Sequence, residues 1–176
     1  MHNPSQQKRK WLTWIAFACL AAFSSATHAQ EAHCAWMNDA TASGVLNGPV
    51  TLALESAPDD QTICVFTYAR SVKDYSTLRI SVQPLKDSTK DPTKAVHAHV
   101  SLCTSPPGAL KAIGNEAIAC SADIGYSRGE QVIGRVRDRL FIVTVSSTMA
   151  QAPTMTRPLL REKTTMIAEQ VAGALF

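Results

Sequence analysis

The sequence lacks an apolar run long enough to cross a bilayer as a helix. Its longest run, residues 11–23, has 13 residues, whereas a membrane-spanning helix needs about 20. Positive residues at 8–10 precede this run and small residues at 27 and 29 follow it, which is typical of a cleaved signal peptide. We expect a signal peptide at 1–29 and a single domain at 30–176, periplasmic or secreted, with no transmembrane segment in the mature chain. A retained N-terminal anchor is the alternative.

The expected mature chain also lacks an excess of either charge. The whole sequence has 17 Lys and Arg against 14 Asp and Glu, and the excess positive residues are Lys8, Arg9 and Lys10. Nucleic acid binding requires a clustered basic surface, so the composition argues against a nucleic acid partner. Residues 30–176 are enough for one domain with a hydrophobic core and too few for two.

Four cysteines follow the expected cleavage site: Cys34, Cys64, Cys103 and Cys120. An even number of cysteines in an exported chain predicts disulfides. Of the three possible pairings, Cys34–Cys64 and Cys103–Cys120 close the shorter loops and lose less entropy. A zinc site is the alternative, and it is disfavoured because no two cysteines have C-x₂₋₄-C spacing.

Hydrophobic patterns predict six strands and three helices. The strands are expected at residues 50–56, 62–69, 77–85, 117–124, 130–136 and 139–147. The helices are expected from a cap at Asn38 or Asp39 to a stop at Gly48, from Pro92 (capped by Asp91) to Cys103, and over residues 158–175. Residues 104–110, which contain two prolines, are expected to be irregular. The prediction is an α+β domain of order α-β-β-β-α-β-β-β-α, in which helices cover an antiparallel sheet of about six strands.

Residues 125–129, Gly-Tyr-Ser-Arg-Gly, match the G-x-S-x-G pattern of a hydrolase nucleophile. That motif needs a strand before the serine and a helix after it, with a histidine later in the chain. Here a strand is expected on both sides, and no histidine follows Ser127. We therefore interpret residues 125–129 as a β-turn, whose glycines allow unusual backbone angles.

His97 and His99 are the candidate metal ligands of the sequence. On a helix, two residues at this spacing point about 200° apart and cannot bind one ion together. A third ligand with suitable spacing is also missing. We expect no metal and no cofactor.

Arg135, Arg137 and Arg139 surround one expected hairpin turn. The guanidinium group suits carboxylates and phosphates, so these residues are a candidate anion-binding site. The favoured interpretation is a solvated turn, neutralised by Asp138, Glu130 and Glu116.

Gly114, Asn115 and Glu116 are interpreted as a structural turn, in which Glu116 accepts backbone N–H bonds. A lone carboxylate without a second acid or a base is not a catalytic arrangement. We assign no catalytic residue.

A resemblance emerges from five features taken together. They are Cys34 before a short helix, Cys64 in a strand, a G-[ND]-E-A turn at 114–117, the stretch GRVRDRLFIVTV at 134–145 and a closing AEQVAGALF at 168–176. The layout resembles small exported bacterial proteins of unknown function. It is similar to actinobacterial secreted lipoprotein domains and to the extracellular sensor domain of a mycobacterial membrane kinase. The resemblance implies an exported domain that binds, and it brings no catalytic residues.

These observations predict an exported, non-catalytic binding or sensor-like domain whose partner is an envelope protein or a small ligand. One alternative is an envelope structural or assembly factor that binds another protein. The other is a small periplasmic enzyme that uses Glu116 with one of the arginines at 135–139.

Overall fold

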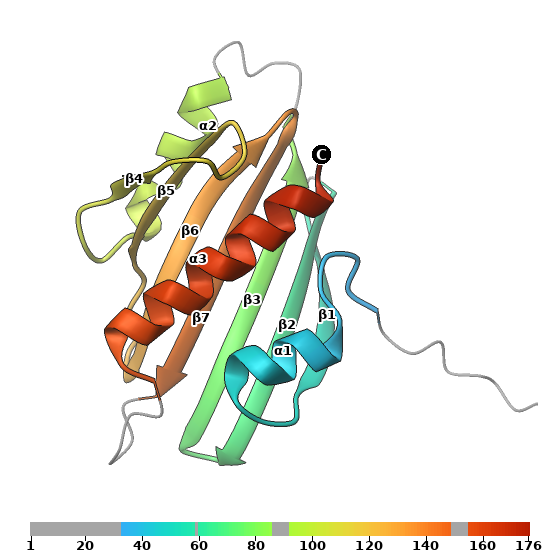
Figure 1. Cartoon of the computed structure of the whole chain (residues 1–176), viewed down its shortest axis with the longest axis vertical. Coiled ribbons are helices and arrows are strands. Elements are labelled where there is room, and N and C mark those ends of the chain that lie inside the picture. Colours follow the sequence, from blue (N-terminus) through green and yellow to red (C-terminus); the bar gives the residue numbers. More distant parts are fainter. Residues whose placement is uncertain (1–32, 59, 86–91, 149–154) are drawn as a thin grey trace, which may run out of the picture. The chain divides into compact units, whose positions relative to one another are not determined.

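The computed structural model describes residues 33–58, 60–85, 92–148 and 155–176. The expected signal peptide and the expected cap at Asp91 lie outside these residues. Within them, seven strands form one antiparallel sheet in the order β1-β2-β3-β7-β6-β5-β4 (Figure 1). The strands are β1 Thr51–Ala57, β2 Gln61–Ser71, β3 Asp74–Pro84, β4 Gly108–Leu110, β5 Glu116–Ser121, β6 Ser127–Val136 and β7 Arg139–Thr148. The helices are α1 Asp39–Leu46, α2 Pro92–Ala98 and α3 Arg157–Ala174, and a 3₁₀ turn spans Val100–Leu102. The predicted α+β class and order of elements are confirmed.

The first and second halves of the chain meet where β3 pairs with β7. Leu78 lies opposite Val145 and Ile80 opposite Val143, and all four side chains are fully buried. Because side chains alternate along a strand, these residues share one face of the sheet. Burial of apolar surface on that face is the main driving force for joining the two halves.

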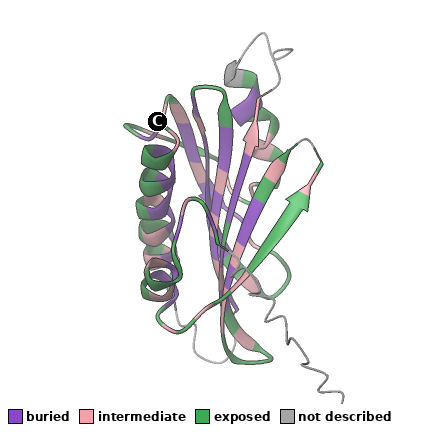
Figure 2. Ribbon diagram, turned by 90° about the vertical axis from the view of Figure 1, so that its right-hand side faces the viewer, coloured by how far each residue is buried: buried purple, intermediate pink, exposed green. Residues whose placement is uncertain are grey.

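Helices α1 and α3 cover this face (Figure 1), with α1 against β2 and β3 and α3 against β6 and β7. In α3, the apolar residues Leu160, Ile167 and Val171 are buried, and Leu175 just after the helix is half-buried. Figure 2 shows the buried residues of α3 turned toward the sheet. The helix therefore follows the 3.6-residue period of its sequence.

Helix α2 packs against the opposite face of the sheet, at one end. Val96 packs there against Ile118, Ile133 and Leu140. These strand residues alternate with those that face α3, so β5, β6 and β7 are buried on both sides at this end. The predicted second helix is shorter than expected: α2 ends at Ala98, and the 3₁₀ turn leads to Cys103.

Strand β4 was not expected from the sequence. Its three residues are too few for an alternating pattern, and they follow Pro106 and Pro107. The segment before β4 is held beside β5 because the Thr104 N–H donates to the Ser121 carbonyl, at 2.8 Å. The neighbouring disulfide holds it there as well, and β4 then pairs with the free edge of β5.

Both disulfides have the predicted pairing. Cys34 is joined to Cys64 with 5.9 Å between the Cα atoms, and Cys103 to Cys120 with 5.6 Å. The first ties the segment before α1 to β2, and the second ties the end of the 3₁₀ turn to β5. The zinc alternative is therefore wrong for these cysteines.

Helix α1 begins as expected and ends one residue earlier than expected. The side chain of Asn38 accepts a hydrogen bond from the Thr41 N–H, at 2.8 Å, which is a standard N-cap. The left-handed residue that ends the helix is Asn47, with φ 61°, rather than Gly48. Gly48 instead allows the Tyr68 ring to approach, since a Cβ atom at this position would clash with the ring.

Candidate functional site

Two hairpin turns lie at the same end of the sheet, the lower end in Figure 1. One turn joins β2 to β3, and the other joins β5 to β6. The register of the sheet places them at a common level, because Ser147 of β7 pairs with Ser76 on one side and with Arg128 on the other. We call residues 70–75 and 123–128 the hairpin end.

Large apolar side chains are exposed at the hairpin end. Val72 is 96% exposed, Tyr126 89% and Ile124 77%, which makes them the three most exposed large hydrophobic residues of the described chain. Tyr75 is exposed as well. Single exposed apolar residues are ordinary on protein surfaces, but here the most exposed ones all lie in two turns at the same end of the sheet, which indicates an interaction site.

The charges of the hairpin end are mostly positive. Arg70 donates a hydrogen bond from Nε to Oδ2 of Asp74, at 3.0 Å. The other acid, Asp123, is bonded to an arginine of α3. Both acids are therefore neutralised, and Lys73 and Arg128 give this end its positive charge.

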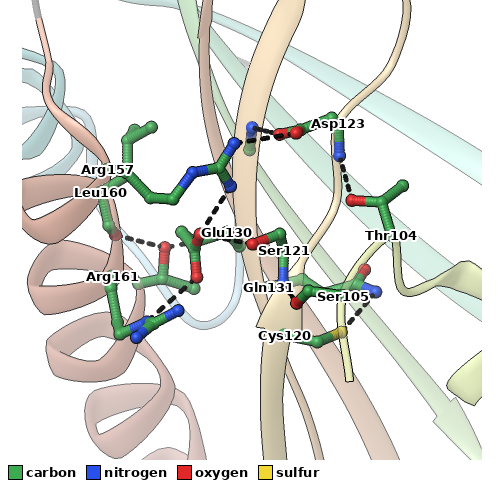
Figure 3. A network of polar contacts seen from close by, with 12 residues as sticks. Thr104, Ser105, Cys120, Ser121, Asp123, Glu130, Gln131, Arg157, Leu160 and Arg161 are labelled. Carbon is green, nitrogen blue, oxygen red and sulfur yellow. Dashed lines mark hydrogen bonds and ion pairs between the residues drawn. The ribbon is translucent and has the colours of Figure 1, made fainter. Parts of the chain in front are cut away.

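Glu130 lies beneath the hairpin end, between the sheet and α3 (Figure 3). Its side chain is only 2% exposed, because strand alternation turns it toward the helix. It accepts hydrogen bonds from Ser121 Oγ at 2.8 Å, Arg157 Nη1 at 2.9 Å and Arg161 Nε at 3.2 Å. A buried carboxylate is tolerated when it is paired and hydrogen-bonded in this way.

Arg157 joins this buried acid to the β5–β6 turn. Its second guanidinium nitrogen, Nη2, donates to Oδ2 of Asp123 at 2.8 Å. Burial alone would raise the pKa of the Asp123 carboxyl, but the hydrogen bonds from Arg157 and the Gly129 N–H and the charges of Arg157 and Arg128 outweigh it, so the pKa lies below its ordinary value. The hydrogen bonds to Asp123 and Glu130 raise the pKa of Arg157. The first turn of α3 is thus held to the turn by charge-assisted bonds.

Thr104 and Ser105, which follow Cys103 in the sequence, support the β5–β6 turn from its other side. The Asp123 N–H donates to Thr104 Oγ1 at 3.2 Å, and the Ser121 N–H donates to Ser105 Oγ at 2.9 Å (Figure 3). On the adjacent strand, the Gln131 amide lies 3.3 Å from the sulfur of Cys120. The β5–β6 turn is therefore braced on both sides.

The G-x-S-x-G stretch forms a tight hairpin between two strands. Ile124 and Ser127 exchange both backbone hydrogen bonds, at 2.9 and 3.1 Å, and Gly125 has φ 57°. Ser127 is the first residue of β6, so a strand follows it. The helix that a nucleophile elbow needs to stabilise an oxyanion is therefore not at this position.

An open pocket of about 440 Å³ lies beside the first turn of α3. Its lining includes Arg157, Pro158, Arg161 and Glu162. The two arginines already donate to Glu130 and Asp123, so much of their hydrogen-bonding capacity is used within the protein. This reduces the suitability of the pocket as an anion site.

The arginines predicted as an anion site lie at the opposite end of the sheet, around the β6–β7 turn. Arg135 donates from Nη1 to the Arg137 carbonyl at 2.9 Å, and the Arg137 guanidinium lies over the Phe176 ring, 5.9 Å from its centre. Arg139 is exposed. Glu130 does not neutralise this turn as expected, because an odd number of strand positions separates it from Arg135, and the two therefore face opposite sides of the sheet.

Residues 114–116 form a turn that supports the β6–β7 hairpin. Gly114 has φ 62°, and a Cβ atom here would clash with the Arg135 carbonyl. Oδ1 of Asn115 accepts a hydrogen bond from the Arg137 N–H at 2.6 Å, and the Asn115 N–H donates to the Arg135 carbonyl at 2.8 Å. The backbone of Arg137 has a left-handed conformation, with φ 52°, and the hydrogen bond from its N–H to Asn115 holds it there.

Glu116 lies 3.5 Å from Nε2 of His97, although Arg135 is its neighbour across the strand pair. His99 uses Nδ1 to contact the Ala95 carbonyl, at 2.9 Å. The two histidines therefore have different partners. Within the described ranges, no group of three His, Cys, Asp or Glu residues could hold a metal ion.

Sequence reasoning missed the buried acid and the group of exposed apolar residues. A signal for Glu130 exists: it is a charged residue that shares its strand face with Val132, Gly134 and Val136, all of which are buried. A signal for its partners is the i, i+4 pair of Arg157 and Arg161 at the start of α3.

Comparisons with protein-family models and with curated proteins find no match to this chain. Of the helices that the structure describes, none is long and apolar enough to cross a membrane.

Proposed function

We propose that the protein is an exported, non-catalytic binding domain that contacts its partner with the hairpin end. The observation that carries this proposal is the exposure of Val72, Ile124 and Tyr126 at one end of the sheet. Exposed apolar side chains are energetically unfavourable in water, and binding removes them from it. The braced β5–β6 turn keeps two of these residues in place, which lowers the entropy lost on binding.

Export is supported by the two disulfides. Disulfides persist in oxidising compartments and are rare in the cytosol. They also suit a domain that must remain folded outside the cell, because each removes conformations from the unfolded chain.

A binding role is favoured over catalysis by the state of the acidic groups. Glu130 and Asp123 are neutralised by hydrogen-bonded arginines, and a general acid or base needs a group that is available to the substrate. The alternative of an enzyme that uses Glu116 with an arginine at 135–139 has little support. The acid contacts His97 at 3.5 Å, while Arg135 donates to the Arg137 carbonyl and Arg137 lies over the Phe176 ring.

The second candidate function is an assembly factor that binds another protein through β1. This strand is one of the two edge strands of the sheet, and Thr51 and residues 53–56 are exposed. An exposed edge has unpaired N–H and C=O groups that can accept an added strand. The observation favours a protein partner at a different surface from the hairpin end.

Photo-crosslinking in the native host tests these two functions. Benzoylphenylalanine is introduced at Val72 or Tyr126 for the hairpin end, at Leu54 for β1, and at Leu102 as an exposed control away from both. The proposed function expects adducts from positions 72 and 126 and none from 102. Adducts from 54 alone would support the assembly factor, and the absence of adducts at 72 and 126 would contradict the proposed function.

A further inference from the structure

The two turns of the hairpin end project to nearly the same height. From the shared level of Ser76, Ser147 and Arg128, the chain continues about three residues to Lys73 and about two to Tyr126. One residue of extended strand is about 3.3 Å. Both turns can therefore touch one flat surface at the same time.

The two apolar groups are small and separate. In the strand order β2-β3-β7-β6-β5, three strand spacings separate the middle of one hairpin from the middle of the other, which is about 14 Å. Protein interfaces concentrate their binding energy in a contiguous central patch that is sealed from water. Two separate convex turns fit a deformable surface better, because lipids can close around each of them.

The side chains have the chemistry of a membrane interface. Tyr126 and Tyr75 combine an aromatic ring with a hydroxyl group, and such residues concentrate at the level of lipid headgroups. Val72 and Ile124 are purely apolar and suit the boundary with the acyl chains. Lys73 follows Val72 directly, and Arg128 lies two residues after Tyr126.

We propose that the hairpin end binds an anionic lipid surface, an inference that rests on the proposed binding function. Val72, Ile124 and Tyr126 enter the headgroup region, while Lys73 and Arg128 contact lipid phosphates. The two acids of the hairpin end are held by arginines and do not repel the surface. Each basic residue near an anionic leaflet strengthens binding by about fivefold at moderate salt, so the attachment is reversible and weakens as salt is added.

Vesicle co-sedimentation tests this proposal with residues 30–176, which contain every described helix and strand and omit the apolar run at 11–23. The vesicles are phosphatidylglycerol mixed with phosphatidylcholine, or phosphatidylcholine alone. We expect binding to the mixed vesicles and at least tenfold weaker binding to phosphatidylcholine alone, since the charge attraction of two basic residues is lost.

Two sets of variants locate the binding surface. Val72→Ser with Ile124→Ser and Tyr126→Ser should weaken binding at least tenfold, whereas Leu102→Ser with Met166→Ser, which changes exposed apolar residues elsewhere, should not. Lys73→Gln with Arg128→Gln should weaken binding about 25-fold, at about fivefold per charge, whereas Lys111→Gln should leave it unchanged. Thermal unfolding of each variant verifies that the fold is retained.

Equal binding to both vesicle types, no binding to either, or equal losses in the hairpin-end and control variants would overturn the lipid proposal. The crosslinking experiment separates this outcome from failure of the proposed function. A protein adduct from position 126 without vesicle binding rejects the lipid surface and supports a binding domain. Lipid adducts from positions 72 and 126 support both.

Discussion

Lys163 of α3 donates a hydrogen bond, at 3.1 Å, to Oδ1 of Asn47, the residue that ends α1. The same ammonium group contacts the carbonyls of Gly44 and Val45 in the last turn of α1. A cation at this position satisfies carbonyls that have no partner within the helix and complements its dipole. Although α1 and α3 are far apart in sequence, one side chain therefore links the two helices that cover the sheet.

Replacing Lys163 with methionine should destabilise the protein modestly. Burial lowers the pKa of the Lys163 ammonium, an effect that Glu162 partly opposes, so its hydrogen bonds are partly offset by a desolvation cost. We expect a loss of about 0.5–1 kcal/mol in the free energy of unfolding, measured by urea denaturation. Lys111→Met, at an exposed position, is the matched control. Equal stability of Lys163→Met and wild type would contradict the capping role.

The buried acid and its arginines should respond unequally to mutation. Glu130→Gln leaves Arg157 and Arg161 without the charge of Glu130, but their side chains are 35% and 60% exposed and can be hydrated. We expect a loss of about 1–3 kcal/mol in the free energy of unfolding. Arg157→Met with Arg161→Met leaves a buried carboxylate without a cation and should cost about 3–5 kcal/mol.

Urea denaturation of these variants at neutral pH measures the asymmetry, with Arg139→Met as a control for loss of an exposed arginine. The reverse order, with Glu130→Gln the more damaging change, would mean that the carboxylate is less dependent on its cations than its burial implies.

Asp123 should make stability depend on pH in the acid range. Its pKa is lowered in the folded protein from an ordinary value of 3.8, so folding favours the ionised form. The resulting stabilisation is present above pH about 4 and is lost as the pH falls through the folded value. Asp123→Asn should therefore be less stable than wild type at neutral pH and should approach it in acid. Urea midpoints measured across this range check the prediction, and a constant difference at all pH values would contradict it.

Each disulfide should stabilise the protein separately. The Cys34–Cys64 bond belongs to the core under α1, while Cys103–Cys120 lies on the side of the sheet that faces α2. Replacing either pair with alanine should cost about 2–4 kcal/mol, and the two losses should add because the bonds share no partners. Urea denaturation measures the losses, and non-reducing peptide mapping of the exported protein should recover only these two pairs. A crossed pair in the map would count against the fold itself.

Export should produce a chain that begins at Gln30. Intact-mass measurement of the exported protein gives its first residue directly. A mature protein that retains residues 11–23 would instead indicate a membrane anchor, and the vesicle measurements would then need to include it.

Much of the fold could be predicted because its signals are local. Alternation in Leu78, Ile80 and Val82 identifies a strand from its own residues, and Asn38 caps α1 through a contact only three residues away. The turn at 125–129 is local too, since its glycines and the absence of a following helical pattern lie within one short stretch. Loop-closure entropy also depends on sequence spacing alone, which is why both disulfides could be paired.

The candidate site could not be predicted as a whole. That Val72 and Tyr126 share one end depends on β7 lying between β3 and β6. The β3–β7 pairs join residues that are 55 (Pro84 and Arg139) to 71 (Ser76 and Ser147) positions apart. No local pattern encodes that register, because it arises from burial of both halves against α1 and α3. The partners of Glu130 were missed for the same reason.

The sequence by itself therefore determined the helices, the six longer strands, their order and the nature of the 125–129 turn, through backbone preferences and short-range periodicity. It determined the cysteine pairs through the entropy of loop closure. Only the tertiary structure decided that β4 forms, that Glu130 is buried against Arg157, and that two hairpin turns lie at one end. These features depend on hydrogen bonds and packing between segments that the sequence leaves far apart, and the energy that favours them exists only once the sheet has assembled.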